Sequence, residues 1–166
     1  FNKHADRVKM AALAQMVNVL QAVLLTEGDK MIKTPTYHVM HMYRHHQDAD
    51  LLESTLTGTG EIGIGEWKVP NVTESVYMDK EGIITITLNN LSVEAAETVE
   101  IQFAGNGYRV TEANIVTGKN MRDHNTFEAP ETVVEQAFSD YKETSETIAV
   151  TLPVNSVVEL RVSKVK

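Results

Sequence analysis

The residues of this sequence that are best able to do chemistry are its histidines and its carboxylates. Four of the six histidines, His38, His41, His45 and His46, lie within a stretch of nine residues. On a helix His41 and His45 would be one turn apart, so both rings could face one metal ion. A catalytic zinc site also needs a third ligand and a positioned carboxylate, as in HExxH, and the sequence lacks that motif. We therefore interpret the cluster as a polar helix face with packing histidines, with an adventitious surface metal as the alternative. We expect no metal site and no cofactor.

Paired carboxylates would indicate a glycoside hydrolase, in which one carboxyl group acts as the acid and the other as nucleophile or base. Most acids of this chain fall in predicted turns, or on outward positions of predicted strands, such as Glu100 and Glu159. Glu27 and Asp29 follow a predicted buried strand, which is where the active sites of barrel enzymes lie. A single strand end supplies only one edge of such a site. We therefore predict that this chain contains no catalytic residue.

Other catalytic signatures are missing from the sequence. It has no cysteine, no GxSxG motif and no GxxxxGK[ST] phosphate loop. The glycine-rich run over residues 58–65 leads into Glu66 and Trp67 and then strands, so we interpret it as flexible chain. The lone Trp67 could stack on a sugar, although a single tryptophan is more often a packing residue.

The composition argues against two classes of partner. The formal net charge is −8, with 23 acidic and 15 basic residues, whereas binding to nucleic acid needs clustered Lys and Arg. No apolar run approaches the roughly 18 residues that span a bilayer. We therefore predict neither nucleic acid nor a membrane as a partner.

The elements that must position these residues divide the chain into two unlike halves. Residues 4–50 predict a helix around residues 8–16, a continuous apolar strand over residues 17–25, a loop, and a second helix after Pro35. The strand has no polar face, which is typical of a strand buried on both sides in a parallel sheet or barrel. Helix, buried strand, helix is the repeating unit of an α/β fold, and one such unit cannot cover its own strand.

From residue 72 onward the apolar period becomes two. Ile84, Ile86 and Leu88 alternate with polar residues, and similar alternation recurs in later segments up to residue 163. Short two-faced strands separated by glycine-containing turns predict an antiparallel sandwich of about seven strands. The Gly/Thr-rich residues 51–71 are interpreted as a linker or crossover. The expected fold class is mainly β, an antiparallel β-sandwich preceded by one helix–strand–helix unit.

Several blocks of the sequence resemble family 51 α-L-arabinofuranosidases. They include His4-Ala5-Asp6-Arg7-Val8-Lys9-Met10-Ala11, Leu25-Thr26-Glu27-Gly28, Thr34-Pro35-Thr36-Tyr37-His38-Val39, His124-Asn125-Thr126-Phe127 and Ser156-Val157-Val158-Glu159-Leu160. The resemblance implies a TIM (β/α)8 barrel followed by a jelly-roll-like sandwich. Residues 1–50 would then be the C-terminal fragment of a TIM-barrel catalytic domain, residues 51–71 a linker and residues 72–166 the C-terminal β-sandwich domain.

The resemblance also implies an activity. Family members are retaining exo-glycosidases that remove terminal α-L-arabinofuranosyl groups from arabinan, arabinoxylan and related saccharides, and they commonly form hexamers. Both catalytic glutamates would lie on earlier barrel strands, before the residue that matches Phe1, so this fragment would be structural and inactive alone. Its expected partners are an arabinose-containing saccharide, the rest of the barrel and further copies of the whole enzyme. The start at Phe1, without an initiator Met or a signal sequence, suggests a piece of a longer protein. The compartment is left open, with a bacterial cytoplasm or periplasm favoured by the resemblance.

One wall of the sugar pocket would be inherited from the family. In several members the loop after the last barrel strand places a Gln beside the bound arabinose, followed by a Thr. Alignment on Thr34 and Tyr37 puts Lys33 at that position. Lysine keeps a hydrogen-bond donor, loses the amide acceptor and adds a charge. Lys33 is therefore the predicted substrate-binding residue, with a solvated loop lysine as the alternative.

Two other functions stay open from the sequence alone. An independent carbohydrate-binding β-sandwich would need an aromatic platform, yet aromatic residues make up only 6% of the chain. A pure interaction module would pack the sandwich or the exposed barrel strand on another chain. We also predict that residues 1–50, apart from a barrel, are less stable than the sandwich unless their helices fold back onto it.

Overall fold

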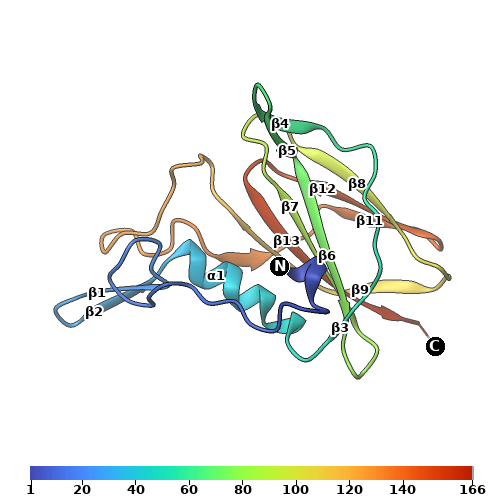
Figure 1. Ribbon diagram of the computed structural model, residues 1–166, viewed down its shortest axis with the longest axis horizontal. Helices are drawn as coiled ribbons and strands as arrows, with labels where there is room; N and C mark the ends of the chain where they lie inside the picture. The colour runs from blue at the N-terminus through green and yellow to red at the C-terminus, as the bar shows by residue number, and fades with distance from the viewer. Residues whose placement is uncertain (166) are drawn as a thin grey trace.

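The computed structural model describes residues 1–165, and two antiparallel sheets dominate it (Figure 1). The large sheet has six strands, in the spatial order β10 (Glu135–Ala137), β9 (Tyr108–Thr117), β13 (Ser156–Lys164), β7 (Ile84–Asn90), β6 (Val72–Met78) and β3 (Asp50–Leu51). The small sheet has three, in the order β11 (Tyr141–Glu143), β12 (Thr147–Leu152) and β8 (Glu97–Gln102). The predicted antiparallel β-sandwich is confirmed. The expected number of about seven strands is too low, because the short edge strands β3, β10 and β11 were not all predicted.

Alternate residues of the central strands form the core between the two sheets. Ile86 and Leu88 of β7 are each 2% exposed, and Leu160 of β13 and Val150 of β12 are completely buried. Side chains alternate across a strand, so burying this face places the intervening residues on the opposite face. The inward positions predicted from the period of two are therefore the ones observed.

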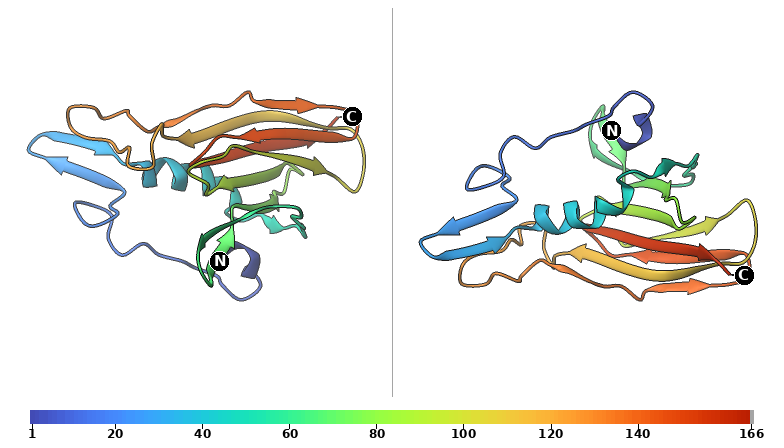
Figure 2. Two further views of the ribbon diagram at one scale, coloured as in Figure 1. Left: turned by 90° about the horizontal axis from the view of Figure 1, so that it is seen from above. Right: turned by 90° about the horizontal axis from the view of Figure 1, so that it is seen from below.

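The outer face of the large sheet is covered as well. The helix α1 (Pro35–Met42) and the 3-10 helix η2 (Tyr43–His46) lie against it, and they contact β9, β10 and β7 (Figure 2). As a result Glu159 of β13 is completely buried. The expectation that Glu159 faces solvent is wrong, because a period of two distinguishes the faces of a strand without revealing what covers each face.

The helix predicted after Pro35 is confirmed. Pro35 occupies its first turn, where a fixed φ and a missing N–H cost nothing. Met42, at the other end, is completely buried and clusters with Val116 of β9 and with Val133. Of the two helices that the predicted alternative folds back onto the sandwich, the second, α1, is therefore observed in that arrangement. No helix among residues 1–165 is long and apolar enough to cross a membrane.

The helix–strand–helix unit predicted over residues 4–50 is not evident. Residues 8–16 form no helix, and the only helical turn before α1 is η1 (Asn2–His4). The strand predicted over residues 17–25 is reduced to β1 (Leu24–Glu27), which forms an antiparallel hairpin with β2 (Lys30–Lys33). Leu20 is 91% exposed. The prediction of a first helix and of a strand buried on both faces is therefore wrong.

Local hydrogen bonds explain the irregular path of this segment. Asn18 and Gln21 have φ values of 54° and 60°, which interrupt an extended conformation. The carbonyl oxygen of Met16 accepts hydrogen bonds from the N–H groups of Val23 and Leu24. The apolar sequence is therefore folded into a turn that leads into the β1–β2 hairpin.

A second hairpin lies within the stretch predicted to be a linker. It is formed by β4 (Glu61–Ile64) and β5 (Trp67–Pro70), which pair antiparallel across a two-residue turn. Gly63 has a φ of +136°, and a Cβ atom there would lie 1.9 Å from the carbonyl oxygen of Trp67. Only glycine fits this position. Trp67 is 88% exposed, so it is not a packing residue of the described chain.

The anchoring of α1 can be tested by truncating Met42. Met42→Ala should lower the free energy of unfolding by about 2–4 kcal/mol, because it leaves a cavity between α1 and the large sheet. Met40→Ala on the same helix should change it by about 0.5 kcal/mol or less, because Met40 is 50% exposed. Urea denaturation followed by circular dichroism measures both values. Equal losses in the two variants would contradict the packing of α1 described above.

Candidate functional site

The junction between β2 and α1 carries the predicted substrate-binding residue. Lys33 is the last residue of β2 and is exposed, and its Nζ lies 4.5 Å from the centroid of the Tyr37 ring. Thr34 follows as the N-cap residue of α1, and its Oγ1 donates a hydrogen bond to the carbonyl oxygen of Ala22 at 2.7 Å. The backbone here is tied down while the lysine head stays accessible. Lys33 therefore presents an ammonium donor at a fixed point of the fold.

The two acids that follow the predicted strand lie at the other end of the same hairpin. Glu27 ends β1 and is paired with Lys30 in the register, while Lys33 is paired with Leu24. Asp29 lies in the turn between the strands, and both acids are exposed. The hairpin therefore separates Glu27 and Asp29 from Lys33. It does not arrange the two carboxylates on facing walls of a cleft.

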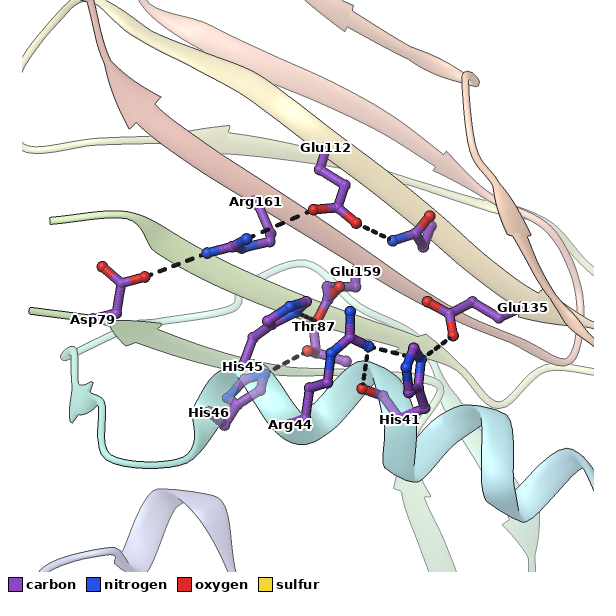
Figure 3. A network of polar contacts seen from close by, with 11 residues as sticks. His41, Arg44, His45, His46, Asp79, Thr87, Glu112, Glu135, Glu159 and Arg161 are labelled. Carbon is purple, nitrogen blue, oxygen red and sulfur yellow. Dashed lines mark hydrogen bonds and ion pairs between the residues drawn. The ribbon is translucent and has the colours of Figure 1, made fainter. Parts of the chain in front are cut away.

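The histidine cluster lies between the helical segment and the outer face of the large sheet (Figure 3). His41 Nδ1 is 2.6 Å from Glu135 Oε2, and His45 Nδ1 is 3.0 Å from Glu159 Oε1. Although the two histidines are one turn apart, they face different carboxylates and do not converge on a shared position. Residues 1–165 contain no group of three potential ligands that could hold a metal ion.

Glu159 is the most unusual titratable group of the cluster. Its side chain is 1% exposed, and Oε2 has no hydrogen-bond partner among the described residues, so His45 is bound through Oε1 alone. Burial raises the pKa of Glu159, and the hydrogen bond from His45 opposes this effect. On the neighbouring strand β9 the pKa of Glu112 is lowered, chiefly because the Asn114 side chain donates a hydrogen bond to it.

Carboxyl groups with pKa values pushed in opposite directions are a pattern that glycosidases use. The location of Glu159 argues against that role, because the residue lies beneath η2. Cavities of about 700, 410 and 260 Å³ are lined by other residues, mainly from the N-terminal segment, residues 52–59 and the strands β6 and β8. A saccharide has no described route to Glu159. We therefore interpret Glu159 and Glu112 as structural.

Asn125 is a residue whose role the sequence did not indicate. It is 3% exposed and belongs to the long connection between β9 and β10. Its Nδ2 donates a hydrogen bond to the carbonyl oxygen of Lys33 at 2.8 Å. The only signal in the sequence was its place in the short motif His124-Asn125-Thr126-Phe127. Such a motif in a loop can carry function, because binding residues often lie on loops that a rigid scaffold positions.

Comparison with protein families and curated proteins gives a consistent result. The sequence model of the family described as alpha-L-arabinofuranosidase C-terminal domain matches residues 1–156. An intracellular exo-alpha-L-arabinofuranosidase of Bacteroides ovatus is 37% identical over 160 residues, which cover 96% of this chain and 31% of that protein. An exo-alpha-(1->6)-L-arabinofuranosidase of Bifidobacterium longum is 29% identical over 157 residues, covering 91% and 30%. The chain thus spans about a third of the length of these relatives.

Solved structures show the same fold. The family 51 arabinofuranosidase from Xanthomonas axonopodis pv. citri superposes with a TM-score of 0.92 and 42% sequence identity, covering 98% of this chain and 33% of that one. The alpha-L-arabinofuranosidase from Thermotoga maritima superposes with a TM-score of 0.81 at 24% identity, covering 98% and 35%. The second comparison supports the fold alone.

The histidine cluster leads to a prediction about stability and pH. His46 Nε2 lies 2.7 Å from Thr87 Oγ1, and burial, assisted by nearby His45, lowers the pKa of His46 to about 4. The unfolded chain therefore binds this proton more tightly than the folded protein does. The contribution of neutral His46 is complete above about pH 6.5 and is lost as the pH falls toward about 4. We expect it to be about 1–2 kcal/mol, because solvent partly screens the ring.

His46→Gln should weaken this loss of stability on acidification, since glutamine keeps a polar partner for Thr87 and does not titrate. His124→Gln is the matched control, because His124 is exposed, and it should keep the parent pH dependence. The parent and both variants share Glu159, whose pKa is raised in the folded protein. Protonation of Glu159 therefore increases the free energy of unfolding as the pH falls, which is opposite to the effect of His46. Urea denaturation between about pH 4 and 7 measures the free energy of unfolding. An identical pH dependence in His46→Gln and the parent would contradict the assignment.

Proposed function

Because this chain belongs to the alpha-L-arabinofuranosidase C-terminal domain family, we propose that it is the C-terminal region of a family 51 glycoside hydrolase. The whole enzyme would release terminal, non-reducing α-L-arabinofuranosyl groups from arabinan- or arabinoxylan-type saccharides by a retaining two-glutamate mechanism. The family match over residues 1–156 is the observation that carries this proposal. The chain spans about a third of its relatives, so the activity is proposed for the whole enzyme.

In this proposal the chain contributes structure and not the reacting carboxylates. Retaining glycosidases hold two carboxyl groups about 5–5.5 Å apart on either side of the scissile bond. Glu27 and Asp29 are exposed at the end of a hairpin, while Glu159 is sealed beneath η2. These placements support the view that both glutamates lie on barrel strands outside this chain.

The proposed barrel would cover the apolar surface of residues 1–50. Large apolar side chains of this segment are exposed, among them Met10, Met16, Leu20 and Met31 at 87%, 63%, 91% and 60%. An exposed apolar surface of this kind typically marks an interface. We propose that residues 1–50 complete the catalytic barrel, that residues 51–71 connect it to the sandwich, and that residues 72–166 form the sandwich domain.

Self-association of the whole enzyme is part of the same proposal. The β4–β5 hairpin exposes Ile64, Trp67 and Val69, with Ile64 and Trp67 paired across its turn. Aromatic residues such as tryptophan are enriched at protein interfaces. This hairpin supports a homo-oligomeric enzyme, in which a second copy covers the exposed side chains.

We further propose that Lys33 forms one wall of the arabinose pocket. Its side chain is exposed beside the Tyr37 ring, and its backbone lies at the end of β2 next to the N-terminus of α1. An ammonium group can donate to sugar hydroxyls while the aromatic ring partly balances its charge. Lys33 would therefore bind substrate and take no part in bond breaking.

The proposal that the catalytic glutamates lie outside this chain can be tested by hydrolysis of an aryl α-L-arabinofuranoside. The whole enzyme should release the aryl group, and the 166-residue chain alone should release none above the uncatalysed rate. A mass-verified, repurified preparation of the chain excludes contamination. Release that survives repurification would contradict the structural role, and Glu27 and Asp29 would be the first residues to replace. A whole enzyme without activity would contradict the proposed function itself.

Lys33→Ala in the whole enzyme should raise KM about three- to tenfold and change kcat little, because the contact is made equally in the ground and transition states. Lys33→Gln keeps a donor and should recover most of the affinity. Lys30→Ala is the matched control, since Lys30 is exposed at the far end of the same strand. Initial rates over a range of substrate concentrations give both constants. A parent-like KM in Lys33→Ala would remove Lys33 from the pocket.

A further inference from the structure

Asn125 connects the sandwich to the β2–α1 junction. Its Nδ2 donates hydrogen bonds to the carbonyl oxygens of Lys33 and Val133, at 2.8 and 2.9 Å. Its Oδ1 accepts a hydrogen bond from the N–H of Val133 at 2.7 Å. A primary amide has two N–H donors, so both are used on backbone carbonyl groups. The side chain is 3% exposed, and water does not replace these contacts.

The orientation of this amide is determined by its partners. Val133 offers one donor and one acceptor, and only one placement of the nitrogen and oxygen of Asn125 satisfies both. Val133 is itself 5% exposed and clusters with Met42 and Val116. The second N–H of Asn125 is therefore directed at Lys33 from a fixed point of the sandwich.

The loop that carries Asn125 is held by its own hydrogen bonds. The Asp123 carboxylate accepts from the N–H of Asn120 at 2.9 Å. Thr126 and Ala129 exchange two hydrogen bonds, one between their backbones at 3.1 Å and one from the Ala129 N–H to Thr126 Oγ1 at 3.1 Å. Asn125 lies between these two turns. The hydrogen bonds of the loop therefore hold Asn125 in place independently of its contact with Lys33.

We propose that Asn125 is a positioning residue for the sugar pocket, which fixes the Lys33 carbonyl group and thereby directs the Lys33 side chain toward arabinose. This inference rests on the proposed function, in which Lys33 contacts the sugar. The other side of the junction is held by Thr34, which binds the carbonyl oxygens of Ala22 and Val23. Asn125 thus makes the sandwich a determinant of pocket geometry, although no sandwich residue needs to touch the substrate.

The energetic reason is that the partly buried Lys33 carbonyl oxygen loses its donor when the Asn125 amide is removed. Without the Asn125 N–H, the Lys33 carbonyl oxygen would have to shift to find another donor. A shifted carbonyl group carries the Lys33 side chain with it and weakens its contact with the sugar. We therefore expect a selective effect on substrate binding that exceeds any effect of general destabilisation.

The test uses Asn125→Ala and Asn125→Asp in the whole enzyme. Alanine removes both donors, and aspartate replaces them with an acceptor that faces two carbonyl oxygens while keeping the acceptor for Val133. Both variants should raise KM for an aryl α-L-arabinofuranoside about three- to tenfold, no more than Lys33→Ala does, with a smaller change in kcat. Thermal unfolding is measured first, and rates are compared at a temperature at which every variant is folded.

Asn90→Ala and Asn90→Asp are the matched controls. Asn90 is 1% exposed, and its Nδ2 donates to the carbonyl oxygens of Ala95, Leu152 and Pro153, so it is also a buried asparagine that ties loops of the sandwich together. It makes no described contact with the β2–α1 junction. The Asn90 variants should therefore lose stability and keep KM within about twofold of the parent.

A double-mutant cycle separates positioning from a structural effect. If Asn125 acts through Lys33, then Asn125→Ala should change KM little in a Lys33→Ala background, because the contact between the Lys33 side chain and the sugar is already missing. Equal KM changes in the Asn125 and Asn90 variants, or additive effects of Asn125→Ala and Lys33→Ala, would overturn this inference and leave the proposed function intact. An inactive parent enzyme, or a parent-like KM in Lys33→Ala, would instead count against the proposed function.

Discussion

Burial of the large sheet on both faces is the constraint on which the rest of the structure depends. One face packs on the small sheet through aliphatic side chains, and the other packs under α1 and η2. Thr87 and Glu159 on that second face are completely buried and cannot reach water, so they need partners from the covering segment. His46 meets Thr87, and His45 meets Glu159. The unusual number of histidines in residues 38–46 therefore reflects the polar sheet face that they cover.

The strands of the sandwich could be predicted because each carries a clear period of two. Ile86, Leu88 and Leu160 fall on the buried face in the sequence and in the structure. The same pattern could not show that Glu159 is buried, because that depends on a helical segment more than 100 residues away in the chain, with His45 and Glu159 separated by 114 positions. The contact of Asn125 with Lys33 spans 92 positions and left no trace in the local pattern.

In the N-terminal segment a clear sequence pattern predicts an element that does not form. Its apolar residues recur at helical spacing over residues 8–16, yet a helix takes most of its stability from packing its apolar face. Here Ala11, Ala12 and Met16 of that face are exposed, so the face has no described surface to pack on. The backbone instead follows turns at Asn18 and Gln21. Helix α1 could be predicted because Pro35 marks its start and because Met42 finds a packing partner in the sandwich.

Helix α1 is held by the sandwich at both of its ends, and this couples stability to the proposed pocket. Near its C-terminus Met42 is enclosed beside Val116, and the following turn is tied to the sheet through His45. Just before its N-terminus the Lys33 carbonyl oxygen is bound by Asn125. The helix therefore links the outer face of the large sheet to the β2–α1 junction. The small sheet lies on the far side of the aliphatic core, away from this junction.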